Sequence, residues 1–187
     1  MPVLTVPAAI DAFVSEYYPN KNFVLSDTDN DTLFLGRFTK PGDVFRSLLK
    51  FDLGELSNNP AFNMISAYLQ LHICRNEVPS GTIEVKLYRL VNTWNPAWLT
   101  WNSQPFAYHN PDQSFIIPAQ WEGMMMVEVS STVKGWLNGD FVNYGLLIKG
   151  NEEQNSIVGI RSSNYNDPAA HPQLKILFES PGSINGT

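Results

Sequence analysis

The stretch FNMISAYLQLHIC, residues 62–74, decides the fold class of this chain. Its apolar side chains fall on every second residue, at Ile65, Ala67, Leu69, Leu71 and Ile73. More polar side chains, such as Gln70 and His72, occupy the positions between them. Because successive side chains of a strand point to opposite faces of a sheet, this pattern predicts a strand with one buried face.

The same alternation recurs further along the chain. It is found in TIEVKLYRLV (82–91), MMMVEV (124–129) and QLKILFE (173–179). NYGLLIKG (143–150) and SIVGI (156–160) instead predict short strands that are buried on both faces. We expect about nine to eleven short strands separated by Gly, Pro, Asn and Asp turns, which predicts an all-β, antiparallel β-sandwich.

One short helix is expected to interrupt the strands. In SSTVKGWLNGD, residues 130–140, Val133, Trp136 and Leu137 recur at the spacing of one helical face. Ser130 or Ser131 suits the N-cap, and a glycine follows at position 139, where helices commonly end. The sequence therefore predicts a helix near Ser131–Asn138.

Length and charge limit the function classes. The 187 residues predict one domain, 1–187, in which 1–10 form an edge-pairing N-terminal strand and 180–187 a C-terminal tail. The net charge is −6 and the basic residues are scattered, which argues against nucleic acid, anionic membranes and strongly acidic polysaccharides. The start of the chain lacks the pattern of a signal peptide, and no apolar run is long enough to insert into a membrane.

Several stretches together resemble a known family. They include LYRLVNTWNPAWLTWNSQP (87–105), VSSTVKGWLNGDFVNYGLLIKG (129–150) and RSSNYNDPAAHPQLKI (161–176). The chain resembles the DNRLRE domain family of surface proteins from about Asp11 to Phe178, although the hexapeptide that names the family is absent. The resemblance implies a jelly-roll-like β-sandwich at the cell surface or outside the cell. The family is similar to carbohydrate-binding modules, some of which hold acidic polysaccharides, and it implies no catalytic residues.

The tryptophans in the segment 90–105 raise the question of a ligand platform. Trp101 is predicted to lie in the core, and so are Trp94 and Trp136. Trp98 falls on the opposite face from Trp101, so it could be exposed and stack on a sugar or contact a neighbouring subunit. The aromatic contact candidates are Trp98 and Trp121, with Tyr68 and Tyr108 as weaker ones.

Metal and catalytic motifs are weak. Asp27, Asp29 and Asp31 alternate as in a calcium loop, but Thr32 replaces the expected glycine and Phe38 the last ligand. A solvated turn is the favoured interpretation, and calcium is the only cofactor we consider. The sequence has no nucleophile, phosphate-loop or zinc-protease motif, which predicts a protein that is not an enzyme.

Two functions remain open. The favoured hypothesis is a structural subunit of a surface fibre, layer or coat, with copies of itself as partners. The alternative is a carbohydrate-binding module that uses exposed loop aromatics to hold a polysaccharide. The first hypothesis depends on the apolar N-terminal residues Val3, Leu4, Thr5 and Val6, which could pair with a sheet edge of the next subunit or of their own domain.

Overall fold

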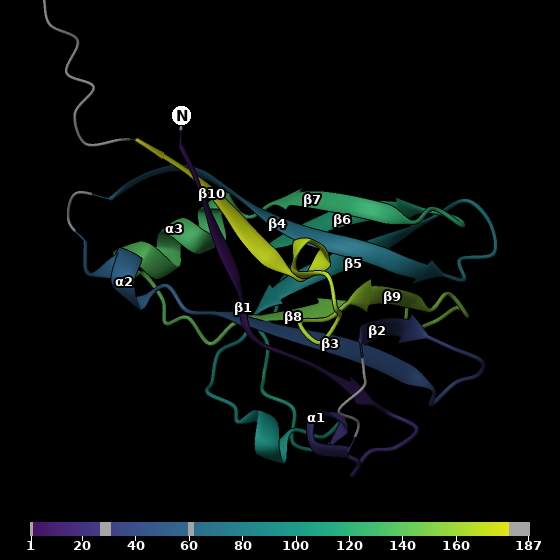
Figure 1. The fold of residues 1–187 in the computed structure, drawn as a ribbon. Helices are drawn as coiled ribbons and strands as arrows, with labels where there is room; N and C mark the ends of the chain where they lie inside the picture. The colour runs from purple at the N-terminus through teal and green to yellow at the C-terminus, as the bar shows by residue number, and fades with distance from the viewer. Residues whose placement is uncertain (1, 27–30, 60–61, 180–187) are drawn as a thin grey trace, which may run out of the picture.

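The computed structural model describes residues 2–26, 31–59 and 62–179 as a sandwich of two packed sheets (Figure 1). The strands are β1 (Val3–Ser15), β2 (Thr32–Arg37), β3 (Val44–Phe51), β4 (Asn63–Asn76), β5 (Thr82–Arg89), β6 (Gln113–Pro118), β7 (Gly123–Glu128), β8 (Leu146–Lys149), β9 (Val158–Arg161) and β10 (Gln173–Glu179). The helical segments are α1 (Phe23–Ser26), α2 (Gly54–Ser57), α3 (Ser130–Asn138) and two 3₁₀ turns, η1 (Pro96–Trp98) and η2 (Pro168–Ala170). The all-β prediction is confirmed.

Each of the two sheets is built from antiparallel pairs. In sheet A, β10 and β9 pair with successive parts of one edge of β4, and β7 pairs with the other edge. In sheet B, the order is β1, β3, β8, β5 and β6. The strands predicted from the alternating pattern therefore lie in two sheets, as expected for a sandwich.

Two strands pass from one sheet to the other and tie the layers together. β1 pairs with β10 over Val3–Pro7 and with β3 from Ala8 onward, with a register shift between Ala8 and Ile10. β2 pairs with β9 up to Leu35 and with β3 from Gly36 onward. Gly36 has a φ of 90°, a left-handed conformation that glycine adopts without a Cβ penalty, and the strand changes its partner there.

The pairing of β1 answers the question that the N-terminal sequence raised. Val3, Leu4, Thr5 and Val6 all pair with β10 of the same chain, so their main-chain groups are used within the sandwich. The structure has the intrachain alternative. The proposed C-terminal tail, 180–187, lies outside the described residues.

The core between the sheets contains the apolar faces that the alternation predicts. Ala67, Leu69, Leu71 and Ile73 of β4 are fully buried. Ile65 was predicted to join them but is 44% exposed. The reason is a bulge, because the pairing of β4 with β10 shifts register between Leu177 and Phe178 and leaves Ile65 without a cross-strand partner. The alternation of buried and exposed side chains along β4 therefore does not extend from Ala67 back to Ile65.

Helix α3 covers one end of the core. Val133 and Trp136 are buried, and Gly139 ends the helix with a φ of 76°. The backbone N–H of Asp140 donates to the carbonyl of Gly135, which satisfies an orphan group at the helix end. The predicted helix is confirmed, but neither serine is the N-cap: Val129 is, and the Ser130 hydroxyl contacts β4 instead.

Removal of residues 2–7 tests the intrachain pairing of β1. Leu4 and Val6 pack against the core, and half-burial of each side chain is worth about 1 kcal/mol, so the truncated chain should lose at least about 2 kcal/mol of unfolding free energy. Urea unfolding of both chains measures the loss. Equal stability, together with loss of self-association in light scattering, would favour pairing between subunits instead.

Candidate functional site

The tryptophan-rich segment forms a loop that lies on the outer face of sheet B. A second hydrophobic cluster fills the space beneath it, separate from the core between the sheets. Its buried members are Ala12, Val14, Leu48, Leu90, Leu99 and Leu147, and Trp94 and Trp101 pack against them. The Trp94 indole N–H donates to the carbonyl of Tyr144 at 2.8 Å. Most of the tryptophan-rich loop therefore completes the fold by covering sheet B.

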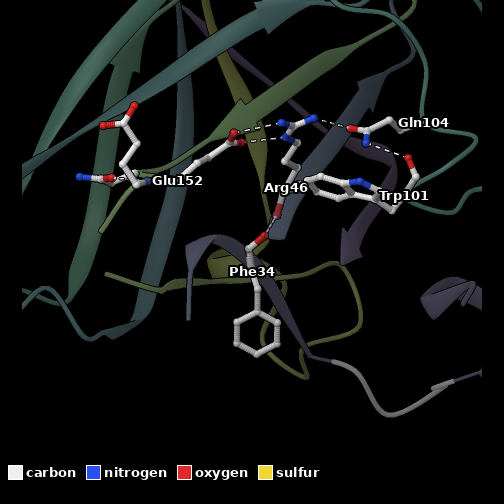
Figure 2. Close-up of polar contacts among 8 residues, drawn as sticks. Phe34, Arg46, Trp101, Gln104 and Glu152 are labelled. Carbon is white, nitrogen blue, oxygen red and sulfur yellow. Dashed lines mark hydrogen bonds and ion pairs between the residues drawn. The ribbon is translucent and has the colours of Figure 1, made fainter. Parts of the chain in front are cut away.

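Trp101 is not in the core between the sheets, so that prediction was wrong. Trp101 is half-buried, and the Arg46 guanidinium lies 4.4 Å above its ring (Figure 2). The strand alternation used to place Trp101 does not apply, because Leu99–Trp101 belongs to the loop after η1 and not to a strand. Trp136, by contrast, is 5% exposed and lies in the core as predicted.

The loop is fastened at η1 by asparagine side chains. The Asn95 carboxamide accepts a hydrogen bond from the Ala97 N–H at 2.9 Å and so starts the 3₁₀ turn. The Asn22 carboxamide donates to the carbonyls of Pro96 and Leu99 at 2.7 and 2.9 Å. These contacts hold the backbone while the Trp98 side chain stays 76% exposed at the turn.

Beside this loop, three basic side chains form a row across sheet B. Arg46 of β3 is the direct cross-strand partner of Lys149 of β8, and Lys149 is the direct partner of Lys86 of β5. Direct partners in antiparallel strands point to the same face. We call Arg46, Lys149 and Lys86 the cationic row. Like charges in such positions destabilise a sheet, so the row is not explained by stability.

Arg46 is held rigidly at one end of the cationic row. Its Nε and Nη2 atoms donate to the two carboxylate oxygens of Glu152 at 2.7 and 3.0 Å. Its Nη1 donates to Gln104, whose carboxamide donates in turn to the carbonyl of Trp101 (Figure 2). A bidentate carboxylate pair fixes the orientation of a guanidinium. Arg46 therefore connects the loop to the sheet, and its positive charge is part of the cationic row.

Lys149 is the central cation of the row and the least compensated. Burial lowers its pKa from the ordinary value of 10.5, and the charge of Arg46 lowers it further, although Glu152 opposes this. Among the described residues, no carboxylate lies within ion-pair distance of Lys149, whereas Lys86 has Glu84 at 3.3 Å. The Lys149 ammonium lies 5.1 Å from the centre of the Tyr88 ring. An anionic group placed over the row would relieve this repulsion.

The other aromatic contact candidates do not join the cationic row. Tyr68 lies on the outer face of sheet A, opposite Lys175 on one side and Glu128 on the other. Trp121 follows β6 and is half-buried against the core. Tyr108 is 50% exposed in the loop before β6, with the Arg89 guanidinium 4.5 Å from its ring. Trp98 and Tyr108 both lie in the connection between β5 and β6, and of the four candidates only Trp98 lies in its tryptophan-rich part, 90–105.

The calcium hypothesis gains no support from the described residues. The Asp31 carboxylate forms an ion pair with Arg161 at 2.8 Å. Asp27 and Asp29 lie outside the described residues. No group of three or more His, Cys, Asp or Glu side chains in the described part of the chain is arranged to hold a metal ion.

Sequence reasoning missed the cationic row because cross-strand register is not visible in a single sequence. A signal existed in RSLLK, VKLYR and LLIKG, each of which places a basic residue on the face opposite to a core residue, namely Leu49, Leu87 and Ile148. Nothing in the spacing of these three segments shows that Arg46, Lys86 and Lys149 meet on adjacent strands. The net charge of −6 also gave no indication of the row, because it sums the charges of the whole chain and says nothing of their local arrangement.

Fold and surface together define a class: an all-β sandwich that carries a row of basic side chains on the outer face of one sheet, beside the loop that covers it. The model of Carbohydrate-binding module family 96 matches residues 2–177, and the chain belongs to this family. The match supports the predicted likeness to carbohydrate-binding modules and not the DNRLRE family specifically. A comparison with curated proteins found no match. None of the described helices has the length and apolar character needed to span a membrane.

The two tryptophans predict a difference in stability. Trp136→Ala should lower the unfolding free energy by about 3–5 kcal/mol, because it empties a buried site, and Trp101→Ala by about half as much. Denaturant unfolding of both variants gives the comparison. A larger loss for Trp101→Ala would mean that the cluster under the loop, and not the core between the sheets, dominates stability.

Lys149 predicts a pH-dependent effect on stability. Its pKa is lower in the folded chain than the value of 10.5 in the unfolded one, so between these values the unfolded chain binds more protons. The parent protein should therefore gain stability relative to Lys149→Met as pH rises through this window. At neutral pH the variant should be at least as stable as the parent.

Urea unfolding of both proteins at neutral pH and near pH 10.5 measures the change, and the difference between them removes the effect of other titrating groups. A variant that is clearly less stable than the parent at neutral pH would show that Lys149 supports the fold.

Proposed function

We propose that this chain binds a polysaccharide across the cationic row, and that the polysaccharide carries carboxylate or sulfate groups. Family membership supports binding of carbohydrate. The observation that carries the choice of site is the row itself, in which Arg46, Lys149 and Lys86 face the same side on adjacent strands. Lys149, beside two like charges and without a carboxylate partner among the described residues, lowers stability in this position, so a ligand is the simplest reason to keep it.

The row suits an extended chain of sugars. Adjacent strands lie about 4.8 Å apart, so the three cations repeat at a spacing similar to the length of one sugar ring in a chain. Lys149 and Lys86 each carry an ammonium with three donors, which can bind hydroxyl as well as anionic oxygens. Glu152 and Gln104 use three of the five N–H donors of Arg46, so its main contribution is its charge and its support of the loop.

The net charge of −6 does not oppose this proposal at contact distance. Exposed charges separated by more than about 8–10 Å are largely screened at physiological ionic strength. A bound anion therefore senses mainly the three cations of the row and the two carboxylates paired with them, Glu152 and Glu84, which leaves Lys149 as the cation without a carboxylate partner among the described residues. Net charge slows the approach of a polyanion, so we expect modest affinity that falls further as salt is added.

Trp98 gives the proposal a second component. Its ring is exposed on the loop that borders the row, and an aromatic face of this kind stacks on the apolar face of a sugar ring. The fibre or coat hypothesis has no comparable observation in its favour, since the N-terminal segment pairs within its own chain. Location outside the cell remains an expectation that carbohydrate binding makes reasonable.

Affinity electrophoresis in gels that contain a polyuronate or a neutral β-glucan tests the proposed function. The parent protein should be retarded by the polyuronate, and the double variant Lys86→Met/Lys149→Met should lose the retardation because it removes both accessible cations. Lys175→Met on the outer face of sheet A is the matched control and should behave as the parent. Trp98→Ala should weaken retardation only if the sugar chain reaches the loop.

Two results would contradict this site. In the first, the double variant is retarded as strongly as the parent. In the second, Lys175→Met loses retardation to the same extent, which would place the ligand on sheet A. No retardation by any polysaccharide, in a protein shown by circular dichroism to be folded, would oppose carbohydrate binding itself.

A further inference from the structure

A second surface feature, distinct from the cationic row, lies at the end of the sandwich where β1 leaves sheet B and the hairpin between β2 and β3 turns. A cavity of about 270 Å³ opens there. Six aromatic rings line it: Phe13, Tyr18, Phe23, Phe34, Phe38 and Phe45. Arg75 and Ile157 complete the wall, and we call this cavity the aromatic hollow.

The floor of the aromatic hollow is preformed. Phe13 is 5% exposed, and its ring centre lies 4.5 Å from that of Phe23 and 5.4 Å from that of Phe34. Edge and tilted contacts of this kind are favourable and fix the rings. At the mouth, Tyr18 is 51% and Phe38 is 38% exposed. A ligand would therefore meet apolar faces that need little rearrangement.

Basic side chains surround the mouth. The Arg75 guanidinium lies 5.1 Å from the centre of the Phe38 ring, and the Lys21 ammonium lies 4.7 Å from that of Phe23. An adjoining cavity of about 360 Å³ shares Tyr18, Phe38 and Phe45, and Lys40 lies there 4.7 Å from the ring of Tyr17. Charge and apolar surface are thus combined in one place.

Two carboxylates also belong to this region, and neither cancels the basic charge. Glu77 pairs with Arg75 and is 47% exposed, so solvent screens this pair. Asp43 accepts hydrogen bonds from the backbone N–H and the hydroxyl of Thr39 at 3.2 and 2.7 Å. Among the described residues, Lys21 and Lys40 have no carboxylate within ion-pair distance.

We propose that the aromatic hollow binds a small aromatic carboxylate, with its ring among the phenylalanines and its carboxylate beside Arg75 and Lys21. A neutral sugar fits less well, because its hydroxyls would be buried against rings with few hydrogen-bonding partners. A neutral hydrocarbon would desolvate the cations without compensation. The volume is at the lower end for ligand sites, which suits a ligand with one ring.

The inference does not rest on the proposed polysaccharide site. No residue of the cationic row lines the aromatic hollow or the adjoining cavity. Either site can therefore fail in experiment while the other holds.

Amide NMR of the uniformly ¹⁵N-labelled chain, titrated with 4-hydroxycinnamate and with its uncharged methyl ester, tests the proposal. The acid should give saturable shifts around Phe23 and Phe38 at millimolar concentration or below, and should bind about tenfold more tightly than the ester. Arg75→Met should remove most of the advantage of the acid over the ester, because only Lys21 then remains beside the carboxylate, and should leave binding of the ester unchanged. Phe38→Ala should weaken both, and Lys149→Met should weaken neither.

Some outcomes would overturn the proposal. One is equal affinity for acid and ester, since the cations would then play no part. Another is a set of shifts that map to Lys149 and Tyr88, which would mean that the acid uses the cationic row. Absence of saturable shifts at several millimolar ligand would also overturn it, provided that the parent spectrum is that of a folded protein.

Discussion

Burial of sheet B on both faces is the constraint on which the rest of the structure depends. Leu146, Leu147 and Ile148 of β8 are consecutive and at most 2% exposed. Since consecutive strand side chains point to opposite faces, one face needs sheet A and the other needs a separate cover. The tryptophan-rich loop is that cover, and its Gln104 fixes Arg46. The geometry of the cationic row thus follows from the need to bury Leu147.

The sequence was sufficient to predict the strands, the sandwich and α3, because each depends on local alternation or on a local stop signal such as Gly139. It failed for Trp101 because the partners of a loop are set by tertiary structure. The evidence was nevertheless present: LLIK reads as buried on both faces, and a sheet of that kind needs a cover. Ile65 failed for another reason, since a bulge changes the face of a strand without any mark in the hydrophobic pattern.

The candidate sites were less accessible to prediction than the fold. Trp98 was singled out because strand alternation places it on the face opposite to Trp101, although the segment is a 3₁₀ turn and a loop and not a strand. The cationic row and the aromatic hollow could not, because each brings together side chains from distant segments whose register the sequence does not state. Lys149 and Lys86 meet through the pairing of β8 with β5, and Phe13 meets Phe34 across a change of sheet. Such sites are properties of topology.

The two proposed sites share one physical device, in which an aromatic ring holds a cation. Lys149 lies over Tyr88 and Lys21 over Phe23. A carboxylate partner also holds a cation, as Glu77 does for Arg75, but it offsets part of the charge that a ligand needs. A ring attracts the cation through its quadrupole and carries no net charge, so the cation stays positive and ordered. In a chain with a net charge of −6, this arrangement keeps selected basic groups available to anions while the remaining surface stays acidic.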